Sequence, residues 1–305
     1  EFYPKVQSKK SHELEVNSLN LLVNAARKFT HGKGEDVVNE IMSVSASAGG
    51  VRAKAIIDFQ PEKKEIRAGF SGPLPGFIPC LIKFDGVMEG EESGYYGKLE
   101  YIYNELARNC GINVPKCYLL EGPSYDENKA YHFISERFDR DRDGNKLFHQ
   151  ATLCGLTVSD FRQKNSSNYE IFLKTLRFLA PSSMTEIEEG LKRCIFNIVM
   201  RNEDDHTKNM SFLMDKDGNW LLSPAYDLNY VRINNGHQMS VIGKNQNITR
   251  QDLVELGKCV DIKSKRVHSL IDEVVVVSKT FMNHCLELDL PEDFSKGIDQ
   301  NLIRL

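Results

Sequence analysis

The stretch that decides the fold is "NEDDHTKNMSF", residues 202–212, followed by "LMDKDGNWLLSPAYDL", residues 213–228. An amphipathic helix is predicted to end just before the first stretch. The second stretch has the pattern of a β-hairpin with its turn at "DKDGN". This hairpin would return Asp227 towards the helix exit that carries Asp204 and Asn209. The sequence therefore predicts that these three side chains converge.

The spacing within this loop indicates phosphoryl-transfer chemistry. Asp204 lies five residues before Asn209, which is the spacing of the base Asp and the metal-binding Asn in the catalytic loop of protein kinases. The amide oxygen of Asn209 and the carboxylate of Asp227 would suit Mg²⁺, which keeps its other positions for water and phosphate oxygens. Asp204 would then face an incoming hydroxyl group.

Three other interpretations of the loop compete with this one. A solvated loop with a helix cap would need no chemistry at all. A metallohydrolase could use Asp204, Asp205 and His206 as ligands, but His206 has no H-x-x-x-H partner and no second His/Cys cluster is evident. A Ser-His-Asp hydrolase would need a G-x-S-x-G motif, which is missing. The rest of the chain has to decide between the solvated loop and phosphoryl transfer.

Length and composition limit the classes of protein to which the chain can belong. The chain of 305 residues is long for one core and comfortable for two lobes. A net charge of −4 gives no reason to expect nucleic-acid binding, and the basic cluster 263–266 is typical of solvated surface. Seven cysteines without a C-x-x-C motif favour reduced thiols over disulfides or a zinc site. No apolar run approaches the length of a membrane span, so a soluble cytoplasmic protein is expected.

The order of predicted elements indicates two lobes. Short β-branched runs predict four strands, at 53–59, 77–84, 116–122 and 130–138, with one helix over 93–110 among them. Later helices are predicted over 169–180, 185–200 and, as one long element, 263–288. Thr185 and Glu188 have capping-box spacing at the second of these.

We therefore expect an α+β, bilobal, protein-kinase-like fold. A small strand-rich N-terminal lobe would span residues 1–138, and an all-helical C-terminal lobe would span 139–305. A ligand site is expected in the cleft between them.

The first lobe contains candidates for nucleotide binding. Lys83 lies in an apolar strand-like run, where its ammonium is costly unless it reaches a partner or a ligand. Glu100, on the predicted helix, could be that partner, although an ordinary edge-strand lysine would also explain Lys83. The segment "SVSASAGGVRAK", residues 43–54, is rich in small residues that allow backbone N–H groups to approach phosphates. It matches no Walker A pattern, and a plain hairpin turn would explain it as well.

Taken together, these residues resemble the HipA family of bacterial Ser/Thr kinases, the toxins of type II toxin–antitoxin modules. Five ordered matches over roughly residues 40–290 carry the resemblance. They are "GGVRAKAII", "LEYIYNELARNCGINVP", "SERFDRD", "LFHQATLCGL" and "NEDDHTKNMSF" with the following "LSPAYDL".

The resemblance implies a role for each matching residue. Asp204 would be the catalytic base, with His206 and Lys208 supporting the loop or the transferring phosphate. Asn209 and Asp227 would bind Mg²⁺. The ATP site would be formed by the Gly-rich loop, the lysine–glutamate pair and the segment between the lobes, with these residues: Ser45, Ser47, Gly49, Gly50, Lys54, Lys83, Glu100, Glu136 and Phe138. Autophosphorylation of Ser45 or Ser47 would place negative charge where the ATP phosphates must bind and so switch the kinase off.

The resemblance also implies partners. The protein substrate would be an aminoacyl-tRNA synthetase, and a helix-turn-helix antitoxin would bring the DNA binding. Only about forty residues precede the Gly-rich loop, which resembles the short HipT variants, whose missing N-terminal HipA domain is supplied by a separate small protein. Two alternatives stay open: a kinase-fold subunit acting mainly as an antitoxin-bound repressor, and a small-molecule kinase.

Overall fold

A computed structural model describes residues 19, 22–23, 53–68, 74–86, 94–123, 129–163, 167–181 and 183–305. Its first part is a five-stranded antiparallel sheet in the order β2-β1-β3-β5-β4. The strands are β1 (Lys54–Gln60), β2 (Glu65–Ala68), β3 (Ile78–Lys83), β4 (Cys117–Pro123) and β5 (Lys129–Glu136). The four strands that the sequence predicted are all present.

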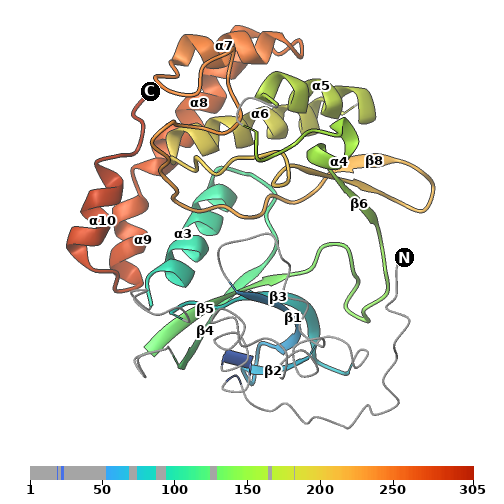
Figure 1. The fold of residues 1–305 in the computed structure, drawn as a ribbon, viewed down its shortest axis with the longest axis vertical. Helices are drawn as coiled ribbons and strands as arrows, with labels where there is room; N and C mark the ends of the chain where they lie inside the picture. The colour runs from blue at the N-terminus through green and yellow to red at the C-terminus, as the bar shows by residue number, and fades with distance from the viewer. Residues whose placement is uncertain are drawn as a thin grey trace.

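Helix α3 (Tyr96–Asn109) packs on this sheet and lies between it and the helices above (Figure 1). The helix approaches β5 so closely that a Cβ atom at Gly97 would lie 1.7 Å from the carbonyl oxygen of Tyr131. The carboxylate of Asp85, just beyond β3, accepts hydrogen bonds from the backbone N–H groups of Gly94 and Gly97. Gly111 ends the helix with a φ of +72°, as its position predicted. These contacts fix α3 relative to β3.

The second part of the chain is mainly helical. Its helices are α4 (Leu153–Thr157), α5 (Tyr169–Leu179), α6 (Met184–Val199), α7 (Arg250–Lys258), α8 (Ser264–Ser278), α9 (Phe281–Glu287) and α10 (Glu292–Asp299). We call the sheet with α3 the strand-rich lobe, and α4–α10 with the strands among them the helical lobe.

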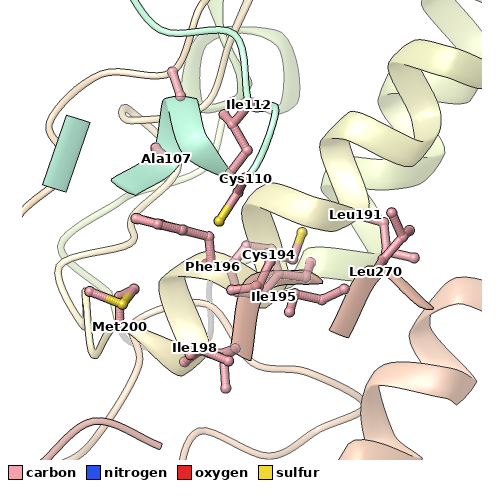
Figure 2. Close-up of a cluster of buried hydrophobic side chains, with 14 of the residues drawn as sticks. Ala107, Cys110, Ile112, Leu191, Cys194, Ile195, Phe196, Ile198, Met200 and Leu270 are labelled. Carbon is pink, nitrogen blue, oxygen red and sulfur yellow. The ribbon is translucent and has the colours of Figure 1, made fainter. Parts of the chain in front are cut away.

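Helix α6 runs through the centre of the larger core. It packs against α5, α7 and α8, and many of its side chains are fully buried. Figure 2 shows Leu191, Cys194 and Ile195 of α6 near Leu270 of α8, with Cys110 at the end of α3 beside them. The end of α6 is therefore held firmly where the chain enters the 202–212 stretch.

The expectation of an all-helical C-terminal lobe is wrong in one respect. A three-stranded sheet, β6-β7-β8, lies in this lobe, formed by His149–Thr152, Ser211–Met214 and Trp220–Leu222. Strands β7 and β8 form the hairpin that the sequence predicted after residue 210. Strand β6 was missed because "HQAT" is short and mostly polar, and only its pairing with β7 makes it a strand.

Two helix boundaries also differ from the predictions. The cap of α6 is Ser183, whose hydroxyl accepts from the N–H of Glu186, so Thr185 lies inside the helix. The predicted helix over 263–288 is broken between α8 and α9. There the hydroxyls of Ser278 and Thr280 donate to the carbonyl oxygens of Val275 and Val277 and compete with regular helix continuation.

All seven cysteines lie in the described part of the chain, where they are free thiols and five of them are buried. Among the helices in the described part of the chain, none is both long and apolar enough to span a bilayer.

Candidate active site

The centre of the site is the ammonium of Lys83, at the end of β3. It contacts the carboxylates of Glu100 on α3 and Asp227 beyond β8. The Lys83 side chain is 14% exposed, that of Glu100 only 3% and that of Asp227 33%. The predicted pair of Lys83 and Glu100 is therefore formed, and Asp227 joins it from the helical lobe.

The neighbouring charges shift the pKa values of Lys83 and Asp227. Burial acts to lower the pKa of Lys83, but the adjacent Asp227 and Glu100 carboxylates outweigh it and raise the pKa above its ordinary value. Burial acts to raise the pKa of Asp227, yet the Lys83 ammonium holds it below the usual range. The raised pKa of Lys83 and the lowered pKa of Asp227 keep Lys83 cationic and Asp227 anionic at neutral pH.

A cavity of about 260 Å³ opens beside this cluster, between the strand-rich lobe and the helical lobe. Its wall includes these candidates from the sequence: Lys54, Lys83, Glu100, Glu136, Phe138 and Asp227. The Phe138 and Tyr226 rings lie 6.0 Å apart across the junction of the lobes. Lys54 of β1 lies opposite Lys83 of β3 in the sheet register. The charge of Lys54 also lowers the pKa of Asp227.

Glu136 lines this cavity, and its carboxylate is also bonded to the neighbouring strand. Its carboxylate accepts a 2.6 Å hydrogen bond from the Tyr118 hydroxyl of the neighbouring strand β4. Four other candidates, Ser45, Ser47, Gly49 and Gly50, lie outside the described residues.

The loop after α6 presents Asp204 at the edge of this arrangement. Its side chain is 47% exposed, and its backbone carbonyl accepts a 3.0 Å hydrogen bond from the side-chain amide of Asn209. Partial burial raises the pKa of Asp204; His206 opposes the shift, while the carboxylates of Asp227 and Asp205 reinforce it. Asp204 and Asp227 thus lie close enough to repel each other electrostatically.

The donor atoms in this loop fit a hard divalent cation. Because the Asn209 nitrogen is used by the Asp204 carbonyl, the Asn209 amide oxygen is the atom left for a ligand. That oxygen and the Asp227 carboxylate are donors of the kind that Mg²⁺ prefers, and the carboxylates of Asp204, Asp205 and Asp227 make the region negative.

His206 and Lys208 both pack on one aromatic ring. The Lys208 ammonium lies 3.7 Å from the centroid of the Phe161 ring, and the His206 ring meets the same ring edge-on at 5.3 Å. The Nε2 atom of His206 is 3.9 Å from the Asp204 carboxylate. These contacts support the shape of the loop, and the sequence had given no reason to single out Phe161.

Sequence reasoning also missed a buried network beneath the loop. Asp205 is fully buried, and its carboxylate accepts from the Tyr169 hydroxyl at 2.6 Å and from the Gln238 backbone N–H at 2.8 Å. The His237 Nδ1 atom lies 2.8 Å from the same carboxylate. The Gln238 side-chain amide reaches Asp204 at 2.6 Å. The only signal in the sequence is a second Asp beside the first, because its partners lie far away in the chain.

A known fold matches this arrangement. The structure of the Shewanella oneidensis toxin–antitoxin system of HipA, HipB and operator DNA contains a chain that matches with a TM-score of 0.62 at 18% identity. The match covers 83% of this chain and 62% of that chain. This likeness confirms the expected kinase-like bilobal fold.

Two curated relatives are named as kinases. A Haemophilus influenzae protein named "Putative kinase" is 26% identical over 144 residues, which are 45% of this chain and 42% of that protein. A Sinorhizobium fredii protein with the name "Putative kinase Y4mE" is 31% identical over 157 residues, 49% of this chain and 34% of that protein. The chain therefore spans less than half the length of either relative.

The family comparison covers more of the chain than either relative does. The model of the HipA-like C-terminal domain matches residues 46–280, which include β1–β8, Asp204, Asn209 and Asp227. On the strength of that match, the protein belongs to the HipA-like C-terminal domain family.

Proposed function

We propose that this chain is an ATP- and Mg²⁺-dependent protein serine/threonine kinase. The observation that carries the proposal is the contact of Lys83 with both Glu100 and Asp227, beside the cavity between the lobes and the Asp204 loop. Phosphoryl transfer consists mostly of positioning and charge stabilisation, and these residues supply both. Family membership and the kinase names of the two relatives support the same reaction class.

Each residue has a role in the proposed reaction. Lys83, held by Glu100, binds the phosphates of ATP. Asn209 and Asp227 hold Mg²⁺, which neutralises charge on the phosphates when it is bound. Asp204 orients the acceptor hydroxyl and accepts its proton. The bond from the γ-phosphorus to the bridging oxygen breaks, the bond to the hydroxyl oxygen forms, and ADP leaves.

The junction of the lobes would receive the adenine. Phe138 lies in the cavity wall and faces Tyr226, which gives the base an aromatic surface. We propose the boundary between the lobes at residues 138 and 139, shortly after the end of β5 at Glu136. Glu136 supports this junction through Tyr118.

The finer assignments follow from the resemblance to the family. We propose that the chain acts as a toxin, that its substrate is an aminoacyl-tRNA synthetase, and that it phosphorylates itself on Ser45 or Ser47. The HipA structure was solved with HipB and operator DNA, so a DNA-binding antitoxin is the partner proposed here.

Intact-mass spectrometry tests the core of the proposal. The purified chain is incubated with and without Mg·ATP, beside the Asp204→Asn variant, and residues 43–54 are then mapped as peptides. We expect added phosphate on Ser45 or Ser47 in the parent chain, and a turnover lower by about 10²–10⁴ in the variant. Equal phosphorylation of both proteins would contradict the role of Asp204.

Two other outcomes would redirect the assignment. ATP binding without transfer to any protein would favour the antitoxin-bound repressor subunit. Phosphorylation of free metabolites, with no protein product, would favour a small-molecule kinase.

A further inference from the structure

The segment 233–248 holds a residue against the proposed catalytic base. Within it, Gly236 has a φ of +74°, and a Cβ atom there would lie 2.2 Å from the carbonyl oxygen of Asn245. Residues 237 and 245 are joined twice: the His237 N–H donates to the Asn245 carbonyl at 3.0 Å, and the Asn245 amide donates to the His237 carbonyl at 2.7 Å. The backbone that leads into residue 238 therefore has little freedom.

A buried carboxylate fixes the same segment from below. The Asp205 side chain is fully buried and accepts the Gln238 N–H at 2.8 Å. It also contacts His237 Nδ1 at 2.8 Å and the Tyr169 hydroxyl at 2.6 Å. The His237 Nε2 atom has no hydrogen-bond partner among the described residues. Asp205 thus ties residues 237 and 238 to α5.

The Gln238 side chain then reaches the neighbouring aspartate. Its Nε2 atom donates to Oδ1 of Asp204 at 2.6 Å, a short, charge-assisted hydrogen bond. His206 approaches the same oxygen, at 3.9 Å. In the described part of the chain, the side-chain contacts of Asp204 fall on Oδ1, so Oδ2 is the oxygen left for an acceptor hydroxyl.

We propose that Gln238 is a positioning residue for phosphoryl transfer, holding the Asp204 carboxylate by Oδ1 so that Oδ2 faces the acceptor. The inference rests on the proposed function, because it needs Asp204 to meet the acceptor hydroxyl. The two adjacent aspartates then have separate tasks. Asp205 anchors the segment that carries Gln238, and Asp204 touches the substrate.

The physical reason for such a device is the exposure of Asp204. A half-exposed aspartate rotates among several side-chain conformations, and only some of them direct an oxygen at the acceptor. Misplacement of a reacting group by about 1 Å can cost roughly 10²-fold in rate. One hydrogen bond from a fixed backbone restricts this rotation before the substrate arrives.

The first test replaces Gln238 with Met, which keeps the length of the side chain and removes the donor. We expect kcat for phosphate transfer from Mg·ATP to fall about 10- to 100-fold, with KM for ATP unchanged. Gln246→Met is the matched control, since Gln246 lies in the same segment but donates to the Asn234 carbonyl. This control should keep the kcat and melting temperature of the parent.

A second measurement separates positioning from general disruption. Gln238→Met is repeated in the Asp204→Asn background, and the residual transfer rate is compared. If Gln238 acts through the Asp204 carboxylate, the second substitution changes the residual rate by less than about 3-fold. A Gln238→Glu variant, which places a like charge against Asp204, should lose more than the Met variant does.

The outcomes distinguish this inference from the proposed function. An active parent whose kcat is unchanged by Gln238→Met would overturn the inference and leave the kinase assignment intact. Equal fold losses in both backgrounds would reduce Gln238 to a structural role and also overturn it. A parent that transfers phosphate to no acceptor would overturn the proposed function and this inference together.

Discussion

The ammonium of Lys83 contacts two carboxylates that are supplied by two different lobes. Each of these charges would be costly to bury alone, and each is stabilised by the others. One cation against two anions leaves the cluster with an excess of negative charge. A divalent cation at Asp227 would relieve that excess and free Lys83 to engage phosphate, so the arrangement is suited to Mg·ATP.

Removing the cation should destabilise the protein as well as inactivate it. Lys83→Met leaves the 3% exposed Glu100 beside Asp227 without a counter-charge. We expect the free energy of unfolding to fall by about 3 kcal/mol, the usual cost of breaking a buried ion pair. Urea denaturation followed by the fluorescence of Trp220, the single tryptophan, measures it.

The control for this variant is Lys129→Met on the same sheet. Lys129 pairs with Glu121, but both side chains are largely exposed, so its loss should barely move the unfolding midpoint. Equal destabilisation by the two substitutions would show that the Lys83 cluster adds nothing to the stability of the fold.

Individual site residues could be predicted from the sequence where the site depends on spacing within one short stretch. The separation of Asp204 and Asn209 and the hairpin that returns Asp227 are visible in one stretch of chain. Gln238 and Tyr169 were not predictable, because each meets the loop only through the tertiary fold. Phe161 was missed for the same reason, although it carries the Lys208 ammonium on its ring.

At the scale of elements, the approach of α3 to β5 sets the position of Glu100. Gly97→Ala would place a Cβ atom 1.7 Å from the Tyr131 carbonyl oxygen, so the helix has to move. We expect a loss of about 3 kcal/mol in the free energy of unfolding and weaker ATP binding, since Glu100 lies one turn further along the same helix. Calorimetry of ATP binding and urea denaturation measure the two effects.

Gly297→Ala provides the matched control for that substitution. Gly297 lies inside α10, and a Cβ atom there meets nothing within 4 Å. Alanine should therefore stabilise this helix by about 0.5–1 kcal/mol and leave ATP binding unchanged. If Gly97→Ala behaved in the same way, the close packing of α3 on β5 would not control the site.

The start of α7 allows a prediction about pH. Burial acts to raise the pKa of Asp252, but hydrogen bonds from Lys244 and Thr249 outweigh it and hold the pKa below its ordinary value of 3.8. A carboxyl with a depressed pKa stabilises the fold above its unfolded-state pKa, and this contribution is lost as the pH falls through the folded-state pKa. Asp252 also completes the capping box with Thr249.

Asp252→Asn should therefore cost about 1 kcal/mol at neutral pH and much less once the pH lies well below 3.8, where the carboxyl is protonated in both states. Thermal unfolding of parent and variant between these pH values checks the trend. Asp272→Asn on α8, which removes an exposed partner of Arg250 at the start of α7, should show little change at either pH. A difference between Asp252→Asn and the parent that stayed constant with pH would contradict the argument.

Helices and strands were predicted well where the hydrophobic period and the length of a segment both indicate the same type of element. Strands β1, β3, β4 and β5 and helices α3, α5 and α6 have strong patterns, and their ends fall close to the predicted residues. The wrong predictions concern elements that leave no hydrophobic pattern in the local sequence. Strand β6 is defined by its partner, and the break before α9 depends on two hydroxyl groups.

At the scale of the molecule, the lobes are joined by the apolar side chains of α3, which belong to the larger core, and by side chains around the cavity. Lys83 bonds to Asp227 across it, and Phe138 lies near Tyr226 at the junction. A ligand that contacts both lobes adds to these links and therefore stabilises the whole chain. Its effect on unfolding reports binding to the intact site, without any assumption about the protein substrate.

We expect Mg·ATP to raise the melting temperature. A ligand at 100 times its Kd stabilises the folded state by about 2.7 kcal/mol, which corresponds to roughly 5 °C for a chain of this size. Because Asn209 and Asp227 are proposed to act through the cation, ATP with EDTA should give a much smaller shift. Thermal unfolding in both conditions, with the Lys83→Met and Gly297→Ala variants beside the parent, makes the measurement.

The pattern across the three proteins and the two conditions decides the argument. Gly297→Ala should show the full shift, because its substitution lies away from the cavity, while Lys83→Met should show almost none. An equal shift with and without Mg²⁺ would remove the metal from the proposed site. A full shift in Lys83→Met would mean that ATP binds elsewhere, since the cluster of Lys83, Glu100 and Asp227 would then contribute nothing to holding its phosphates.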